Sequence, residues 1–111
     1  MNNTELENNI SRSILRSQKA YDLYKSDKLY FQAKRIYNAN FQIYGLLESY
    51  MQVCDLHMLE NIFEYMFHLE DWFAQFRELE MTKVGLDAPF VFERFEKSIP
   101  FPSEFINKIK N

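Results

Sequence analysis

One stretch of the chain places titratable side chains at helical spacing. His57, Glu60, Glu64, His68 and Asp71 follow one another at intervals of three, four, four and three residues. On an α-helix these intervals put all five side chains on one face. Imidazole and carboxylate groups ligate transition-metal ions, and di-iron helical bundles hold their metals with such groups on facing helices. Metal binding by His57, Glu60, Glu64 and His68 is therefore one hypothesis for this face.

The same residues also fit the solvent-facing side of an amphipathic helix. Neither the pair His57 and Glu60 nor the pair Glu64 and His68 reproduces the Glu-x-x-His motif of di-iron bundles. Glu48 is almost the only carboxylate that the preceding helical segment offers as a facing ligand. A polar helix face explains these residues without a metal. We therefore predict no metal and no cofactor. A metal-binding helical protein ranks third among the functions considered, behind the two that follow.

The single cysteine, Cys54, stands three residues before His57, a spacing that suggests a nucleophile with a neighbouring base. However, Cys54 falls on an apolar stripe with Ala33 and Leu47, where a thiol acts as a small core residue. A reactive thiol needs electropositive surroundings, whereas residues 48–80 carry eight acidic residues and one basic residue. We therefore predict that the protein is not an enzyme and has no catalytic residue.

Basic residues gather in the first half of the chain, where residues 1–47 carry seven basic and four acidic side chains. Arg12, Arg16 and Lys19 recur at helical spacing and predict a basic face of the kind that binds a phosphate backbone. The neighbouring Tyr21 and Tyr24 align with the core stripe instead, and the whole chain has a net charge of −3. A nucleic-acid-linked regulator that uses this face is therefore the alternative hypothesis, behind a protein partner.

Aromatic residues are unusually frequent, with 11 Phe, 7 Tyr and 1 Trp among 111 residues. A domain of this size leaves part of its apolar surface outside, and aromatic residues are enriched at protein–protein interfaces. The segment from Leu56 onward places aromatic residues beside its acidic face, so we predict that this mixed surface binds a protein. The predicted protein-binding residues are Met58, Glu60, Glu64, Tyr65, His68, Asp71 and Trp72. The alternative interpretation is that the apolar members only cover a neighbouring helix and the carboxy-terminal segment.

The favoured function is a non-enzymatic protein–protein interaction module, such as an adaptor, a small chaperone or an inhibitor or immunity-type protein. A homodimer is the default assembly, because two-fold dimers are the commonest oligomers. The polar start MNNTELENNISRS is not that of a signal peptide, and no run of about 20 apolar residues occurs. We therefore expect a cytoplasmic protein that does not insert into a membrane, with Cys54 reduced.

The elements that position these residues are predicted to be helices. Apolar residues at helical spacing, together with few glycines and prolines, indicate an all-α fold. We expect one domain, an up-and-down bundle of three main helices at about 4–25, 27–54 and 56–82, with a short carboxy-terminal helical segment. That segment comprises helices at about 88–97 and 103–109. Alternation of Phe90 and Phe92 makes a short strand an equal interpretation of the first of these.

Three details of the predicted helices bear on packing. Leu6, Ile10, Ile14, Tyr21 and Tyr24 form the predicted core stripe of the first helix. In the second helix, Asn40 lies within the apolar stripe, where it either fixes register as a buried polar residue or sits half-exposed at the edge. Gly45 in the middle of the same helix suggests a close approach of another backbone, or a slight break.

Overall fold

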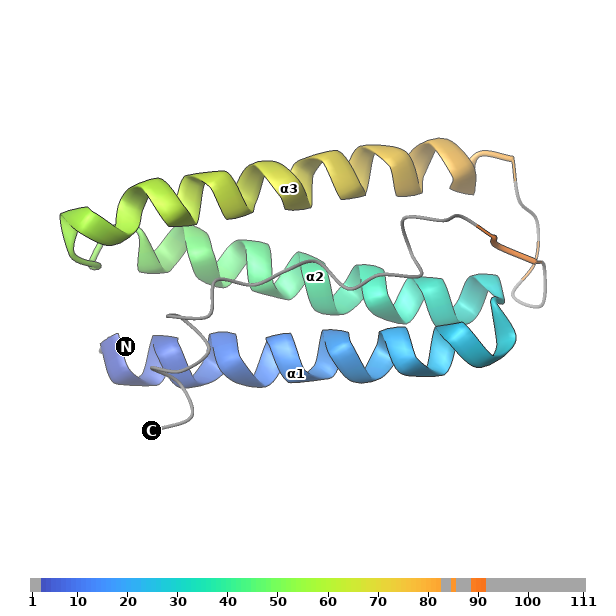
Figure 1. Ribbon diagram of the computed structural model, residues 1–111, viewed down its shortest axis with the longest axis horizontal. Coiled ribbons are helices and arrows are strands. Elements are labelled where there is room, and N and C mark those ends of the chain that lie inside the picture. Colours follow the sequence, from blue (N-terminus) through green and yellow to red (C-terminus); the bar gives the residue numbers. More distant parts are fainter. Residues whose placement is uncertain (1–2, 83–84, 86–88, 92–111) are drawn as a thin grey trace.

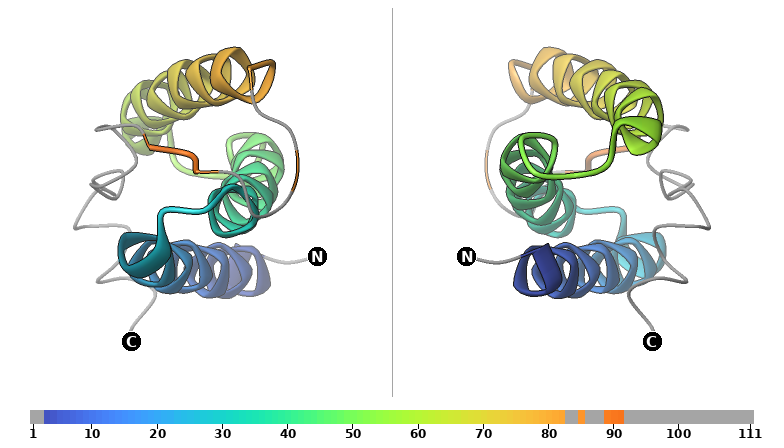
Figure 2. Two further views of the ribbon diagram at one scale, coloured as in Figure 1. Left: turned by 90° about the vertical axis from the view of Figure 1, so that its right-hand side faces the viewer. Right: turned by 90° about the vertical axis from the view of Figure 1, so that its left-hand side faces the viewer.

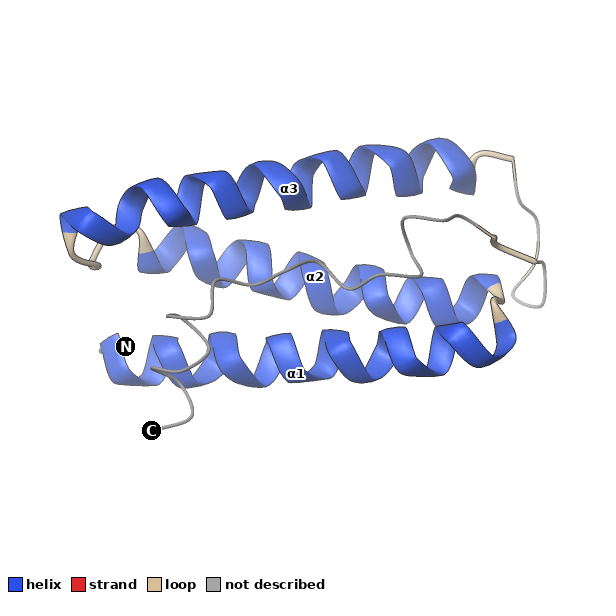
Figure 3. Cartoon of the chain, in the orientation of Figure 1, coloured by secondary structure: helices blue, strands red, loops and turns tan. Residues whose placement is uncertain are grey.

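The computed structural model describes residues 3–82, 85 and 89–91 of the chain. This part contains three helices, α1 (Asn3–Asp27), α2 (Tyr30–Tyr50) and α3 (Leu56–Glu80). α2 lies between the other two, and each helix runs antiparallel to the one before it (Figure 1). Viewed end-on, α2 is offset to one side of α1 and α3 (Figure 2). The predicted all-α bundle of three main helices is confirmed, and colouring by secondary structure shows no strand in the described part (Figure 3).

α1 forms because its apolar side chains recur at helical spacing and meet α2 along one stripe. The five residues predicted for this stripe are all buried, with at most 5% of any residue exposed: Leu6, Ile10, Ile14, Tyr21 and Tyr24. The helix begins one residue earlier and ends two residues later than predicted.

The second helix was predicted to begin at Asp27, but residues 28 and 29 form the junction between α1 and α2. Lys28 adopts a left-handed backbone conformation, with φ of 53°, and its N–H donates a 2.7 Å hydrogen bond to the carbonyl of Tyr24. Leu29 is extended, so α2 starts only at Tyr30. The predicted start was wrong because a left-handed residue ends the helical hydrogen-bond pattern, and Lys28 carries no sequence signal for that conformation.

Residues 89–91 pack beside this junction instead of forming a helix. Pro89 makes an isolated antiparallel bridge with Leu29, and the N–H of Phe90 donates a 2.9 Å hydrogen bond to the carbonyl of Lys28. The hydroxyl of Tyr24 donates a 2.5 Å hydrogen bond to the carbonyl of Phe90, and Phe90 is fully buried. The predicted helix 88–97 is therefore wrong at 89–91, because these backbone groups bond to the junction. Residues 88 and 92–97 and the predicted helix 103–109 lie outside the described residues.

The junction between α2 and α3 is a tight turn. α2 ends at Tyr50, four residues before the predicted end, where the N–H groups of Gln52 and Val53 donate to the carbonyls three residues back, those of Ser49 and Tyr50, in place of the four-residue spacing of an α-helix. Asp55 occupies the N-cap position of α3 in an extended conformation, although its side chain makes no capping hydrogen bond. α3 begins at Leu56 as predicted and ends at Glu80, two residues before the predicted end.

Aromatic rings fill the space between α2 and α3 and join residues 89–91 to it. The rings of Trp72 and Phe76 are stacked with centroids 5.4 Å apart. Phe76 also contacts Tyr37 at 4.9 Å and Phe90 at 5.0 Å. Such ring pairs contribute roughly 0.5–1.5 kcal/mol each beyond the area they bury. This cluster thus accounts for part of the aromatic-rich composition.

The interior between α1 and α2 is polar at its centre. Asn40 is fully buried, and its Oδ1 accepts a 2.6 Å hydrogen bond from the hydroxyl of Ser17. Of the two interpretations of Asn40, the half-exposed edge position is therefore wrong. The buried hydroxyl of Tyr21 lies close to the side chains of Asn40 and Trp72. Within the described part of the chain, its geometry to neither of them meets the criteria for a hydrogen bond. Burial raises the pKa of Tyr21, and these two neighbours lower it in part.

Two polar contacts connect α2 to α3 at the edges of the aromatic cluster. The hydroxyl of Tyr44 donates a 2.6 Å hydrogen bond to Glu70. Glu80 accepts hydrogen bonds from the hydroxyl of Tyr30 and from Nζ of Lys34, the latter at 3.0 Å. The hydrogen bond from Tyr30 lowers the pKa of Glu80, and the salt bridge with Lys34 lowers it further, against a desolvation that raises it. These contacts orient α3 against α2 at two points.

Candidate functional site

Three of the residues predicted to bind a protein lie in the core. Met58, Tyr65 and Trp72 are only 6%, 4% and 5% exposed. They repeat every seven residues and therefore face the same way, on the side of α3 that packs into the bundle. The prediction that they form an exposed aromatic surface is wrong, because α3 is rotated about its axis relative to the orientation that the sequence suggested. The alternative interpretation, in which they cover neighbouring elements, fits their burial.

The polar members of the predicted set do lie on the surface. Glu60, Glu64, His68 and Asp71 are all exposed, as is His57. Asp71 accepts a 3.0 Å hydrogen bond from Nε2 of Gln75 within the helix. The acidic side of α3 is therefore available to a partner, without the aromatic residues that were assigned to it.

Different apolar residues accompany these acids. Leu56, Phe63 and Phe67 are 84%, 48% and 69% exposed, at positions seven and four residues apart on one stripe of α3. Leu56, Phe63 and Phe67, together with Leu59, Glu60 and Glu64, line a shallow depression of about 580 Å³. We refer to Leu56, Glu60, Phe63, Glu64, Phe67 and Asp71 as the outer face of α3.

The chemistry considered for His57 and Cys54 is not supported by their geometry. Within residues 3–82, 85 and 89–91, no three His, Cys, Asp or Glu side chains come close enough together to hold a metal ion. Along α3, four of the side chains considered for that site are all exposed: His57, Glu60, Glu64 and His68. The half-buried thiol of Cys54 lies 3.9 Å from the carbonyl of Met51 and packs against the core.

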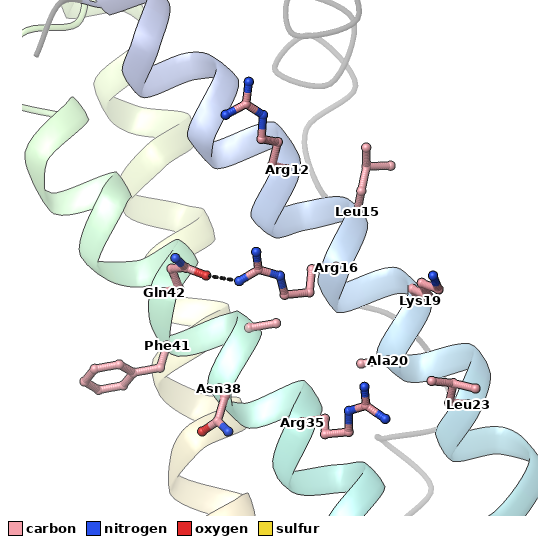
Figure 4. A pocket seen from close by; sticks show the side chains of 11 residues that line it. Arg12, Leu15, Arg16, Lys19, Ala20, Leu23, Arg35, Asn38, Phe41 and Gln42 are labelled. Carbon is pink, nitrogen blue, oxygen red and sulfur yellow. Dashed lines mark hydrogen bonds between the residues drawn. The ribbon is translucent and has the colours of Figure 1, made fainter.

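The predicted basic residues Arg12, Arg16 and Lys19 are exposed and line a groove of about 850 Å³ between α1 and α2. Arg35 adds a fourth cation from α2, so the groove is basic on both sides (Figure 4). The guanidinium of Arg16 reaches across it and donates a 2.7 Å hydrogen bond to Oε1 of Gln42. We refer to this feature as the basic groove.

The basic groove also exposes apolar surface. Leu15 and Leu23 on α1 are 56% and 40% exposed and belong to its lining. Phe41, which is 63% exposed, lies at its rim and points away from α1 (Figure 4). The ring of Phe41 stacks on Tyr37 at 6.2 Å and meets Phe73 edge-on at 6.2 Å. The groove therefore combines cations with leucine side chains.

Sequence reasoning missed Leu56, Phe67, Arg35 and Phe41 as surface residues. The spacing of Arg35, Asn38 and Gln42 at intervals of three and four was a signal for a polar face on α2. Nothing in the sequence indicated that this face would meet that of Arg12 and Arg16, because their meeting depends on how α1 packs against α2.

None of the three helices combines the length and apolarity that a bilayer span requires, as far as the described residues extend. No protein-family model, curated protein or solved structure matches this chain.

Proposed function

We propose that the protein is a non-enzymatic protein–protein interaction module that docks through the outer face of α3. The observation that carries this proposal is the exposure of three large apolar side chains, Leu56, Phe63 and Phe67, along one stripe of a single helix. Scattered apolar residues are ordinary on a protein surface, whereas a contiguous stripe marks an interaction site. The depression that these residues line offers a place for a partner's side chain.

The charges beside the stripe suit a recognition surface. Glu60 and Glu64 line the same depression, and Asp71 is exposed further along the helix. Buried apolar contacts supply most of the affinity of an interface, while charges around them accelerate association and reject wrong partners. The outer face would thus select a partner that carries basic groups around an apolar centre. An adaptor, a small chaperone or an inhibitor or immunity-type protein would each use such a surface.

The proposal includes a cytoplasmic setting. Cys54 is the single cysteine of the chain, and it is half-buried. A reducing compartment keeps such a thiol from forming disulfides with other chains.

The experiment is recovery of tagged protein from its native host, with variants of the outer face. Phe63→Ser combined with Phe67→Ser removes two exposed rings and should leave folding intact. Met81→Ser is the matched control, because Met81 is 87% exposed but lies beyond the last residue of α3.

A partner recovered in stoichiometric amount with the natural chain and with Met81→Ser, but lost with the double variant, is the expected result. Circular dichroism must show that the double variant is folded. Equal recovery of every stoichiometric partner by the double variant would remove the outer face of α3 from the function.

A further inference from the structure

The basic groove is not used by the proposed docking face, and its chemistry is complementary to that face. We propose that the basic groove of one copy of this chain binds the outer face of α3 of a second copy. This inference rests on the proposed function, since it names the partner of the same face. It also gives the protein a second binding surface, with a defined occupant.

The first support is charge. Arg12, Arg16, Lys19 and Arg35 line the groove, and no carboxylate is found among its lining residues in the described part. The side-chain hydrogen bonds of Arg12 and Arg16 go to neutral amides, at 3.4 Å to Asn9 and 2.7 Å to Gln42. Their positive charge is therefore not compensated by those partners.

The outer face carries the opposite charge. Glu60, Glu64 and Asp71 are exposed there, and residues 48–80 as a whole carry eight acidic residues and one basic residue. Complementary potentials of this kind steer two surfaces together and disfavour like-charged arrangements. Two copies that approached with their outer faces toward each other would instead meet with like charges.

The second support is spacing along the two helices. With a rise of 1.5 Å per residue, Arg12 and Arg16 are separated by about 6 Å along α1, and Glu60 and Glu64 by about 6 Å along α3. An amphipathic helix can lay its apolar stripe into a groove between two others, with charged pairs on the flank. The outer face has the length and charge spacing for that mode of binding.

The apolar residues of both surfaces also correspond. Leu15 and Leu23 in the groove are about 12 Å apart along α1, and Leu56 and Phe63 are about 10.5 Å apart along α3. Both pairs are exposed in the single chain and would be covered together. This correspondence favours a helix over a nucleic acid as the occupant, because a phosphate backbone gains nothing from exposed leucine side chains.

The contact joins two different surfaces, so it is heterologous. Such contacts produce open chains or rings, unless two copies exchange both contacts around a two-fold axis. The oligomer is therefore expected to depend on concentration, and to weaken as salt screens the charges.

The experiment measures mass by sedimentation or light scattering for the natural chain and two charge-reversal variants. The groove variant is Arg16→Glu with Lys19→Glu, and the face variant is Glu60→Lys with Glu64→Lys. All four residues are exposed, so both variants should fold, which circular dichroism checks. Lys25→Glu is the control, because Lys25 is exposed on α1 but does not line the groove.

The expected result is self-association of the natural chain and of the control, with each reversal variant weakened by about tenfold or more. Mixing the two reversal variants should restore association, since each then offers the surface that the other has lost. A natural chain that stays monomeric at the highest concentration it tolerates would overturn the inference. So would a groove variant that associates like the natural chain, because the contact would then lie elsewhere.

Two further outcomes separate this inference from the proposed function. If the natural chain is monomeric while the ring variant at Phe63 and Phe67 still loses a stoichiometric partner, self-docking is wrong and the proposed function stands. Fluorescently labelled single-stranded and duplex DNA and RNA are tested against the same proteins at low salt. Binding that the groove variant abolishes, without any self-association of the natural chain, would make the groove a nucleic-acid site and overturn self-docking.

Discussion

The hydroxyl of Ser17 on α1 donates a 2.6 Å hydrogen bond to Oδ1 of Asn40 on α2, and both residues are buried. A polar pair at the centre of an apolar interface can be satisfied only when the two helices meet in one alignment. Sliding α1 along α2 by one turn would leave both groups buried without that bond. The pair therefore specifies the register of α1 on α2.

Ser17→Ala is expected to lower the free energy of unfolding by about 1–3 kcal/mol, because Oδ1 of Asn40 then remains buried without its donor. Chemical denaturation of both proteins measures the difference. Adding Asn40→Leu to Ser17→Ala should recover part of the loss, because replacing both polar partners removes the unsatisfied group. A double variant that loses more free energy of unfolding than Ser17→Ala and Asn40→Leu lose together as single variants would show that the bond is not the source of the loss.

The two glycines should respond oppositely to alanine. Gly45 lies in an exposed helical position with nothing within 4 Å of an added Cβ, so the predicted close approach of another backbone was wrong. Gly45→Ala is expected to raise the free energy of unfolding by up to about 1 kcal/mol. Gly85 has equal space but a φ of +90°, so Gly85→Ala should be neutral to destabilising. Thermal melts of the two variants provide the comparison, and a loss of stability in Gly45→Ala would contradict the expectation.

Tyr24→Phe should loosen the attachment of residues 89–91 to the helix junction. The substitution keeps the ring in the core but removes the hydroxyl that bonds to the carbonyl of Phe90. The amide of Phe90, which bonds to the carbonyl of Lys28, should then exchange with solvent faster, by about five- to tenfold for a loss of about 1–1.4 kcal/mol. Hydrogen exchange read by NMR tests this, and the amide of Ile43 in the middle of α2 serves as the internal reference. Unchanged protection of Phe90 would mean that the backbone bond alone holds the segment.

Tyr44 should make the protein sensitive to alkali. Its hydrogen bond to Glu70, with some desolvation, raises the pKa of Tyr44 to about 12 from the ordinary value of 10.0. The neutral phenol is the form that folding favours, so its contribution is fully present below pH 10 and is lost as the pH rises toward 12. Tyr44→Phe should therefore show a shallower loss of stability across that range than the natural chain. Denaturation at a series of pH values measures both slopes, and equal slopes would contradict the role of the Tyr44–Glu70 bond.

The rotation of α3 is tested by substitutions on its two sides. Trp72→Ala removes a ring stacked on Phe76 in the core and should cost about 3–5 kcal/mol. Phe67→Ala removes an exposed ring and should change the free energy of unfolding by about 0.5 kcal/mol or less. Similar costs for the two variants would contradict the orientation described for α3.

The sequence predicted the helices well wherever apolar spacing alone decided the outcome. The stripe of α1 was obtained in this way. The start of α2 was not, because Lys28 takes a left-handed conformation for which the local sequence gives no signal, in a junction that also bonds to Phe90. Local spacing cannot report a contact between Lys28 and Phe90, which are 62 positions apart in the sequence.

The candidate site was predicted only in part, because the pattern of apolar residues on α3 is ambiguous. α3 carries large apolar residues on nearly every side, so periodicity could not distinguish the buried Trp72 from the exposed Phe67. Its acids were identified correctly as exposed, because a carboxylate is rarely buried without a partner. The basic groove could not be predicted, because it forms only when the packing of α1 on α2 brings Arg35 opposite Arg16.

The position of Trp72 gives the molecule its own optical reporter. It is the single tryptophan of the chain, is almost fully buried, and stacks on the ring that also contacts Phe90. Its fluorescence therefore responds to polarity at the point where α3 and residues 89–91 meet. Loosening of that segment should shift the emission before the helices melt, whereas docking at the basic groove should leave it unchanged. One unlabelled sample can thus separate opening of the bundle from binding at its surface.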